Sequence, residues 1–342
     1  MGNEKLEQLY EDIYIKQNQI LAKLNATKDM DSVLVDVRGE RLFYKDFPVS
    51  EADMEGFKEK FIGLVKGLDE DSIDTVVRAI NRIKAIKNST DTYMNLYTES
   101  EKAEYRYIEE NYKNAVIKIS DNCYFSKGIY LPEDFFEPCV FYDKCGARGV
   151  EHKEYFMDKD IIDAGAYIGD SAAVLSRMTN GKVHAFEPTS KSFNSMLETI
   201  KLNELEDKVI PYNLGLSDEK GTLTFTNSIV GTTNSQRLDS PLPYVSTEEV
   251  KVTTVDEIVC EQELQIGLIK VDVEGAEQLL LKGALNTIKT QKPTLLISIY
   301  HNGDDFYSIK QIIENLDLGY HFKITHPAFG SVLTETVLIA EL

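Results

Sequence analysis

The sequence predicts an α/β fold, a mainly parallel sheet preceded by a mainly helical N-terminal domain. Residues 1–112 carry apolar side chains at helical spacing, residues from 160 onward alternate short apolar runs with helical stretches, and the last two runs have no helix between them. Alternating strands and helices are typical of a parallel sheet, whereas a short connection requires an antiparallel pair. We therefore divide the chain into a helical domain, residues 1–112, and a sheet domain, residues 113–342.

Helices are predicted over four N-terminal segments with helical apolar spacing: residues 4–25, residues 50–66, a helix capped near Asp71 or Ser72 and running past Ile83, and residues 100–112. The β-branched and aromatic runs at 33–37 and 41–44 predict a hairpin that turns at Gly39. None of these segments has catalytic spacing. We expect the domain to act as a cap or as an oligomerisation module, with a homodimer formed through its first helices.

The sheet domain begins with two short strands at 116–119 and 129–131. Five parallel strands are then predicted, at 161–162, 183–186, 209–216, 267–273 and 294–299. Helices are predicted between them at 171–178, 190–203, 277–289 and 307–316. The last two strands, 320–325 and 336–340, form an antiparallel hairpin. Five parallel strands that end in a hairpin favour a seven-stranded sheet over the six-stranded dinucleotide-binding one.

Composition limits the partners of the chain. The formal net charge is −20, which repels a phosphate backbone, and lysine and arginine are scattered among acids, so we expect no nucleic-acid partner. No run approaches the roughly 20 apolar residues of a membrane span. The charged first ten residues lack the apolar stretch of a signal peptide, so we expect a cytoplasmic protein that binds no membrane. The polar segment 227–249 is long enough to be a substrate lid.

The most informative motif is Asp163-Ala-Gly-Ala-Tyr-Ile-Gly169, which follows a strand and opens a helix. Glu187 ends the next strand about 20 residues later, where a carboxylate can accept hydrogen bonds from both ribose hydroxyls of an adenosyl group. NAD carries a pyrophosphate, which Asp163 would repel and which usually needs a third glycine where Ala166 stands. S-adenosylmethionine carries a sulfonium and an ammonium, which Asp163 would attract. The motif therefore favours S-adenosylmethionine over NAD.

These segments resemble the FkbM family of methyltransferases. The resemblance covers about residues 160–342 and rests on the turn at Asp163, on Phe186-Glu187-Pro188 and, most specifically, on Ile269-Lys-Val-Asp-Val-Glu-Gly-Ala-Glu277. It implies a Rossmann-like, seven-strand class I methyltransferase fold and methyl transfer to a hydroxyl oxygen of a sugar, glycan or small metabolite. Ten residues are expected to bind the cofactor: Asp163, Gly165, Ala166, Gly169, Asp170, Ser171, Glu187, Pro188, Leu216 and Ser217.

Three residues are the candidates for catalysis. Asp272 ends the fourth parallel strand, Glu274 follows it, and His301 follows the fifth, so all three should lie at the same edge of the sheet. His301 or Asp272 is expected to accept the hydroxyl proton, because alignment alone does not activate a weakly acidic alcohol. Glu274 is expected to orient substrate or cofactor. We expect no metal, although one group of oxygen-rich residues could be considered for magnesium or calcium: Asp272, Glu274, His301, Asp304 and Asp305.

Other functions remain open at this point. A protein that binds an adenosyl ligand without turnover, or that serves in assembly through its helical domain, would keep the same fold. An NAD-dependent oxidoreductase is disfavoured by Asp163 and the missing glycine. An amine or amide nitrogen is the less usual acceptor in the family that the sequence resembles.

Overall fold

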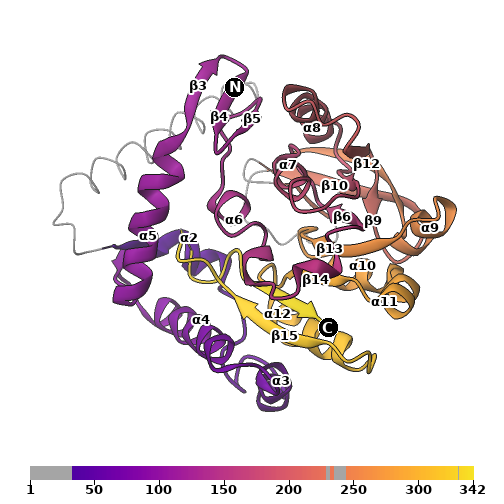
Figure 1. Cartoon of the computed structure of the whole chain (residues 1–342). Helices are drawn as coiled ribbons and strands as arrows, with labels where there is room; N and C mark the ends of the chain where they lie inside the picture. The colour runs from indigo at the N-terminus through magenta and orange to yellow at the C-terminus, as the bar shows by residue number, and fades with distance from the viewer. Residues whose placement is uncertain (1–32, 229–231, 235–243, 330) are drawn as a thin grey trace.

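The computed structural model describes residues 33–228, 232–234, 244–329 and 331–342 and is centred on a seven-stranded sheet (Figure 1). The predicted helix at residues 4–25 lies outside the described residues. Across the sheet the strands follow the order β15-β16-β14-β13-β6-β7-β8. Their bounds are β6 Asp160–Ala164, β7 Val183–Phe186, β8 Val209–Tyr212, β13 Ile266–Val271, β14 Thr294–Ser298, β15 His321–Thr325 and β16 Val337–Glu341.

Strand order reverses at β6. The chain runs from β6 to β7 and β8 on one side and later to β13 and β14 on the other, and all five strands pair in parallel. β16 is antiparallel to both of its neighbours, β14 and β15. This confirms the seven-stranded α/β sheet with a final hairpin. In such sheets ligands bind beyond the carboxyl ends of the strands at the reversal, which here lies between β6 and β13.

Helices cover both faces of the sheet, because successive strand residues point to opposite sides. Ile161 joins the core under α7 and α8, and Ile162 joins the core under α9 to α12. The helices are α7 Asp170–Leu175, α8 Ser190–Leu202, α9 Val255–Glu261, α10 Glu277–Gly283, α11 Leu285–Gln291 and α12 Gly303–Glu314. The single helix predicted at 277–289 is divided at Gly283, where a Cβ would stand 2.0 Å from the carbonyl oxygen of Ser217.

Between residues 33 and 112, the described part of the N-terminal region, there are four α-helices: α2 Val37–Phe43, α3 Phe57–Val65, α4 Glu70–Asn88 and α5 Glu99–Asn111. The predicted hairpin at Gly39 is wrong. Asp36 accepts a hydrogen bond from the Arg38 N–H and caps α2, so Gly39 lies inside a helix. The short strand β1, Val35–Asp36, pairs instead with β2, Tyr93–Met94.

Helix ends depend on local caps that the apolar spacing does not reveal. α3 begins at Phe57 rather than near residue 50, because the Glu51 carboxylate accepts the N–H groups of Gly56 and Lys58 and holds the preceding segment in turns. α4 is capped by Asp69, earlier than predicted. α5 agrees with the prediction within a residue at each end and begins with a Thr98–Glu101 capping box.

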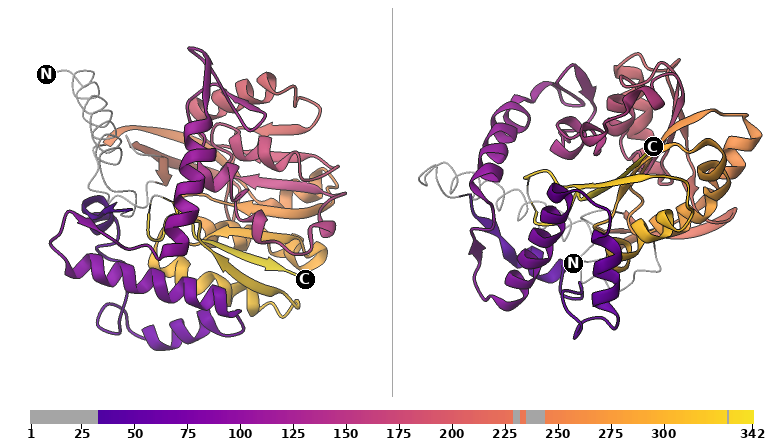
Figure 2. Two further views of the ribbon diagram at one scale, coloured as in Figure 1. Left: turned by 60° about the vertical axis from the view of Figure 1, so that its left-hand side comes forward. Right: turned by 60° about the horizontal axis from the view of Figure 1, so that its bottom comes forward.

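The N-terminal helices pack against the last hairpin of the sheet. α4 contacts β15, and α3 contacts α12 (Figures 1 and 2). Their buried residues, among them Val76 and Ile83, belong to the same apolar cluster as Ile162 and Ile324 of the sheet. One continuous core therefore joins the two parts, and the boundary at residue 112 stays a prediction.

Two smaller sheets complete the described fold. β3 Ile117–Ser120, β4 Cys123–Ser126 and β5 Ile129–Leu131 form an antiparallel meander, which is followed by the short α6, Pro138–Phe141. β9 Gly215–Leu216, β10 Gly221–Ser228, β11 Thr232–Asn234 and β12 Tyr244–Thr253 form a four-stranded sheet. The ends of the proposed lid, residues 227–249, therefore lie in β10 and β12, and part of it lies outside the described residues. Among the described helices, none has the length and apolar character needed to span a bilayer.

Candidate active site

The turn between β6 and α7 is built on close backbone contacts. Gly165 has φ +78°, and a Cβ there would stand 1.8 Å from the carbonyl oxygen of Asp272. Gly169, with φ +83°, lies against Met196 of α8 in the same way. Side chains at either position would displace the turn from the carboxyl ends of β6 and β13. The two glycines therefore fix the turn at the reversal of strand order.

Four N–H groups of this turn, those of Gly165, Ala166, Tyr167 and Gly169, are already used within the protein. Those of Gly165 and Ala166 both donate to the carbonyl oxygen of Phe186, at 3.1 and 3.0 Å, and that of Gly169 donates to Ala166 at 2.7 Å. The N–H of Tyr167 donates to Oε2 of Glu187 at 3.2 Å. A pyrophosphate is held by free N–H groups at such a turn, so this arrangement does not suit a dinucleotide.

Asp163 lies beneath the turn and is fully buried. Its Oδ1 is 3.2 Å from Nζ of Lys270, and its Oδ2 accepts a hydrogen bond from Oγ of Ser171 at 2.6 Å. Lys270 also donates to the carbonyl oxygen of Gly165 at 2.7 Å. From the sequence we expected the negative charge of Asp163 to attract a cationic ligand. In the structure that charge is paired with Lys270, because a buried carboxylate requires a partner.

Glu187 lies at the end of β7, beside the turn. Its Oε1 accepts hydrogen bonds from the N–H and the hydroxyl of Thr189, at 2.9 and 2.6 Å, and its Oε2 accepts the N–H of Tyr167. Burial raises the pKa of Glu187 to about 7. Asn213 donates to the carbonyl oxygens of Glu187 and Pro188, at 3.0 Å each, and so ties this segment to the end of β8.

The remaining predicted cofactor residues surround the same turn. Asp170 and Ser171 open α7 and are buried, and burial raises the pKa of Asp170 to about 7. Gly215, the first residue of β9, packs against Pro188. Leu216 and Ser217 follow it and are also buried. The ten predicted residues therefore lie in β6, the turn from β6 to α7, α7, the end of β7 and β9, with Ser217 directly after β9.

The three predicted catalytic residues come together at the neighbouring strand ends. His301 follows β14, and its Nε2 is 3.5 Å from Oδ1 of Asp272 and 3.6 Å from Oε2 of Glu274. Its Nδ1 is 2.9 Å from Oε1 of Glu277. Burial alone would lower the pKa of His301, but Glu277, Glu274 and Asp272 together raise it to about 10. His301 is therefore an imidazolium near neutral pH.

Glu277 has a larger part in the site than its sequence position suggests. It is the first residue of α10, a position where a carboxylate often does no more than stabilise the N-terminus of its helix. Its Oε1 instead accepts the N–H groups of Val273 and Gly275, at 3.1 and 3.2 Å, and faces His301. Burial would raise the pKa of Glu277, but the His301 cation lowers it to about 2. Glu277 thus stays ionised and fixes the orientation of the imidazole ring.

Sequence reasoning gave no role to three further residues beside Asp272. The Tyr300 hydroxyl donates to Oδ1 of Asp272 at 3.5 Å and to Oε1 of Glu335 at 3.4 Å. Glu335 also has a carboxylate oxygen within 4.8 Å of one from Glu137. Tyr300 and Glu335 stand in Ser298-Ile-Tyr-His301 and Glu335-Thr-Val-Leu338, segments of family resemblance that could have drawn attention to them. Nothing in the sequence pointed to Glu137.

Two groups among the described residues have spacing that could hold a metal ion. Asp272, Glu277 and His301 form one, and Glu137, Cys139 and Glu335 form the other, each with ligand atoms within 4.8 Å of one another. Of the larger set considered from the sequence, Asp272, Glu274 and His301 lie together, while Asp304 and Asp305 have other partners. Asp304 pairs with Lys60 at 2.9 Å, and Asp305 is bound by Gln278 and Asn302.

The sequence and the fold of this chain resemble those of known methyltransferases. A model of the methyltransferase FkbM domain matches residues 163–322, from the buried acid of β6 to the start of the final hairpin. Residues 163–322 of this chain are thus similar to an FkbM methyltransferase domain. The crystal structure of methyltransferase FkbM from Methylobacillus flagellatus has the same fold, with a TM-score of 0.53 at 19% identity over 85% of this chain and 60% of that one.

Two curated proteins are similar in sequence to part of this chain. The hexuronic acid methyltransferase AglP of Haloferax volcanii is 30% identical over 165 residues, which cover 47% of this chain and 64% of AglP. Methyltransferase 1 of Beauveria bassiana is 24% identical over 220 residues, covering 58% of this chain and 87% of that protein. This chain therefore spans less than two thirds of the length of AglP and of the solved FkbM chain.

Proposed function

We propose that this chain is an S-adenosylmethionine-dependent methyltransferase that methylates a hydroxyl oxygen of a sugar, glycan or other small metabolite. The observation that carries the proposal is the pairing of Glu187 with a glycine turn in which four N–H groups already donate within the protein. Glu187 can accept from ribose hydroxyls, while the turn offers little to a pyrophosphate. An NAD-dependent oxidoreductase fits this turn poorly. The FkbM domain supports the methyl donor.

The residues present fit that cofactor. Glu187 would hold the ribose, the turn from Gly165 to Gly169 would lie against the donor, and Leu216 and Ser217 would lie on the adenine side. When bound, S-adenosylmethionine supplies an activated methyl group on a sulfonium. The buried Asp163–Lys270 pair keeps the turn in place, because Lys270 binds both Asp163 and the carbonyl oxygen of Gly165.

Asp272 is the residue that we propose to receive the proton of the acceptor hydroxyl. His301 is already protonated near neutral pH, so it cannot act as the base. Its Nδ1 faces Glu277 and its Nε2 faces Asp272 and Glu274, and the imidazolium therefore orients these carboxylates. Asp272 remains partly exposed at the strand end, where an acceptor can reach it. The His301 cation also limits the negative charge of the site, and we assign no metal to the reaction.

The choice of a sugar-like acceptor rests on two lines of support. AglP, whose name states a hexuronic acid as its substrate, is among the proteins most similar to this chain. Carboxylates at the site, such as Asp272 and Glu335, are the acceptors that sugar hydroxyl groups pair with most readily. The formal charge of −20 disfavours nucleic acid as the acceptor.

Transfer of a labelled methyl group tests the proposal. The chain is incubated with labelled S-adenosylmethionine and neutral, amino and carboxylate glycosides, and label in the glycosides is counted. Asp272→Asn is expected to lower the rate by about 100-fold or more, since a positioned base contributes that much. Asp207→Asn, on the exposed surface after α8, is the control and should not change it. Labelling at nitrogen instead of oxygen, or full activity of Asp272→Asn, would contradict the assignment, as would activity lost on chelation and restored by magnesium.

A further inference from the structure

The loop between β15 and β16, residues 326–336, is held by the N-terminal helices. The Tyr44 hydroxyl pairs with Oγ of Ser331 at 3.1 Å and with Oγ1 of Thr334 at 3.0 Å. Oε2 of Glu40 accepts the Ser331 hydroxyl at 2.9 Å. The Tyr97 hydroxyl donates to the carbonyl oxygen of Ser331 at 3.4 Å. Three separate N-terminal side chains thus converge on Ser331.

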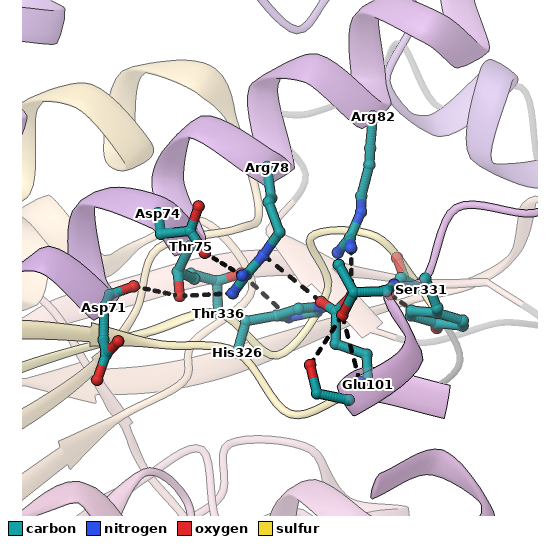
Figure 3. A network of polar contacts seen from close by, with 12 residues as sticks. Asp71, Asp74, Thr75, Arg78, Arg82, Glu101, His326, Ser331 and Thr336 are labelled. Atoms are coloured by element: carbon teal, nitrogen blue, oxygen red, sulfur yellow. Dashed lines mark hydrogen bonds and ion pairs between the residues drawn. The ribbon is translucent and has the colours of Figure 1, made fainter. Parts of the chain in front are cut away.

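A second group of contacts holds the start of this loop. Figure 3 shows His326 and Ser331 beside the buried pair formed by Arg82 of α4 and Glu101 of α5, whose atoms approach to 2.5 Å. Phe329 stacks on Tyr105 of α5, with ring centroids 6.1 Å apart. The 326–336 loop is therefore held by α4 and α5 in addition to the two strands, β15 and β16, that it connects.

The end of this loop places Glu335 at the acceptor side of the proposed active site. Glu335 has φ +72°, in the left-handed region, and its Oε1 accepts from the same Tyr300 hydroxyl that donates to Asp272. Tyr300 thus joins Glu335 directly to the proposed base. Both carboxylates keep part of their surface accessible.

Negative charge is concentrated around Glu335. Glu137 lies close to it, and Asp272 and Glu274 lie beyond Tyr300 and His301. Burial, together with the repulsion from Asp272 and Glu137, raises the pKa of Glu335 to about 8, so the Glu335 carboxyl carries its full negative charge only above that pH. Among the described cations, Lys270 is paired with Asp163, His301 is held by Glu277, and Lys113 acts on Glu137 only at a distance.

We infer that Glu335, presented by a loop that the N-terminal helices hold in place, is a specificity residue that selects a neutral or amino-bearing acceptor and rejects a carboxylate-bearing one. The inference rests on the proposed methyltransferase function and deepens it. An anionic sugar would place its carboxylate among Glu335, Glu137 and Asp272, where like charges at short range repel. A hydroxyl or ammonium group there would donate to the same oxygens. The acceptor class would then differ from the hexuronic acid named for AglP.

Three matched acceptors test this inference: methyl glucoside, methyl glucosaminide and methyl glucuronide, which differ mainly in charge. With saturating S-adenosylmethionine at pH 9, where the Glu335 carboxylate is ionised, kcat/KM for the first two should exceed that for the glucuronide by at least about tenfold. Glu335→Gln should reduce this gap by about tenfold while the Kd for S-adenosylmethionine is unchanged. Where a glycoside binds without turnover, the same ratios are taken from its dissociation constants.

A second charge-removing substitution, far from the proposed site, serves as the control. Glu198→Gln removes the same charge from the exposed surface of α8 and should leave the ratios unchanged. A glucuronide preferred over the glucoside, equal ratios in Glu335→Gln and the unmodified chain, or no binding of any glycoside to the cofactor-loaded protein would overturn the inference alone. Failure to bind S-adenosylmethionine would instead overturn the proposed function on which it rests.

Discussion

The proposed contact of Glu187 with an adenosyl ribose requires the carboxylate form, and the surroundings of Glu187 disfavour that form. Burial raises the pKa of Glu187 to about 7, even though Thr189 and Tyr167 donate to its oxygens. Because the folded protein binds this proton more tightly than the unfolded chain, Glu187 lowers stability as pH rises from about 4.5 to about 7. The residue is thus adapted to a ligand rather than to stability.

A pH dependence of cofactor affinity follows. Ribose hydroxyls donate to the ionised form, so binding should release a proton and S-adenosylmethionine should bind more tightly as pH rises through about 7. Calorimetric titrations between pH 6 and pH 8, in two buffers of different ionisation enthalpy, measure affinity and proton release together. Glu187→Gln should bind more weakly and lose most of the pH dependence. The same slope in both proteins would show that another group is responsible.

Asp163 shows what residue-level reasoning from sequence can and cannot provide. The sequence identified the acid, the glycines and Glu187 as one group, and the structure places them around one turn. The partner of Asp163 is Lys270, more than 100 residues away, and pairing at that distance along the chain depends on strand order. The high pKa of His301 was also unreadable, since it arises from three carboxylates brought together by two strand ends and a helix.

At the scale of elements, the turn from β6 to α7 depends on glycine at position 165. An alanine there would adopt an unfavourable left-handed conformation, at roughly 1–2 kcal/mol, and would also clash with the carbonyl oxygen of Asp272. Gly165→Ala is therefore expected to lower the free energy of unfolding by more than about 2 kcal/mol, and to weaken cofactor binding.

Gly39 offers a matched control in the same chain. It lies in α2, and a Cβ there would meet no atom within 4 Å. Gly39→Ala should leave stability unchanged or raise it by up to about 1 kcal/mol, as expected for a helix. Urea denaturation measures both variants. Equal effects at the two positions would show that the turn at Gly165 has no special backbone requirement.

Whether an α-helix could be located from the sequence depended on whether its N-terminal cap could be recognised there. α5 could be placed within a residue because Thr98 and Glu101 form a capping box in the sequence. The hairpin expected at Gly39 failed because Asp36 caps a helix, and the partner of β1 lies in residues 93–94, far along the chain. Capping residues in the sequence thus located helices such as α5, whereas the short strand β1 depends on its pairing with a segment that is distant in the sequence.

In the molecule as a whole, the N-terminal helices belong to the architecture of the site. They share a core with the sheet and hold the 326–336 loop that carries Glu335. Arg82 and Glu101 form the buried link between α4 and α5 at this interface (Figure 3). Sequence spacing predicted α3, α4 and α5 but not α2, and it could not show which part of the sheet these helices would cover.

Removal of Arg82 is expected to weaken that link. Arg82→Met leaves the partly buried Glu101 with less of its charge compensated, which should lower the free energy of unfolding by about 2 kcal/mol, between the cost for an exposed and for a buried pair. Lys118→Met removes one partner of an exposed pair with Asp121 and should cost less than about 1 kcal/mol. Urea unfolding of both variants compares them. A loss in Arg82→Met no larger than that in Lys118→Met would show that the helices are not held through this pair.

The central claim is that the turn at Asp163 and Glu187 binds a sulfonium donor rather than a dinucleotide. Calorimetric titration of the whole chain with S-adenosylmethionine and, separately, with NAD tests it most directly. We expect S-adenosylmethionine to bind with a Kd on the order of micromolar, about −8 kcal/mol, and NAD to give no binding heat. Binding of NAD without binding of S-adenosylmethionine would contradict the account.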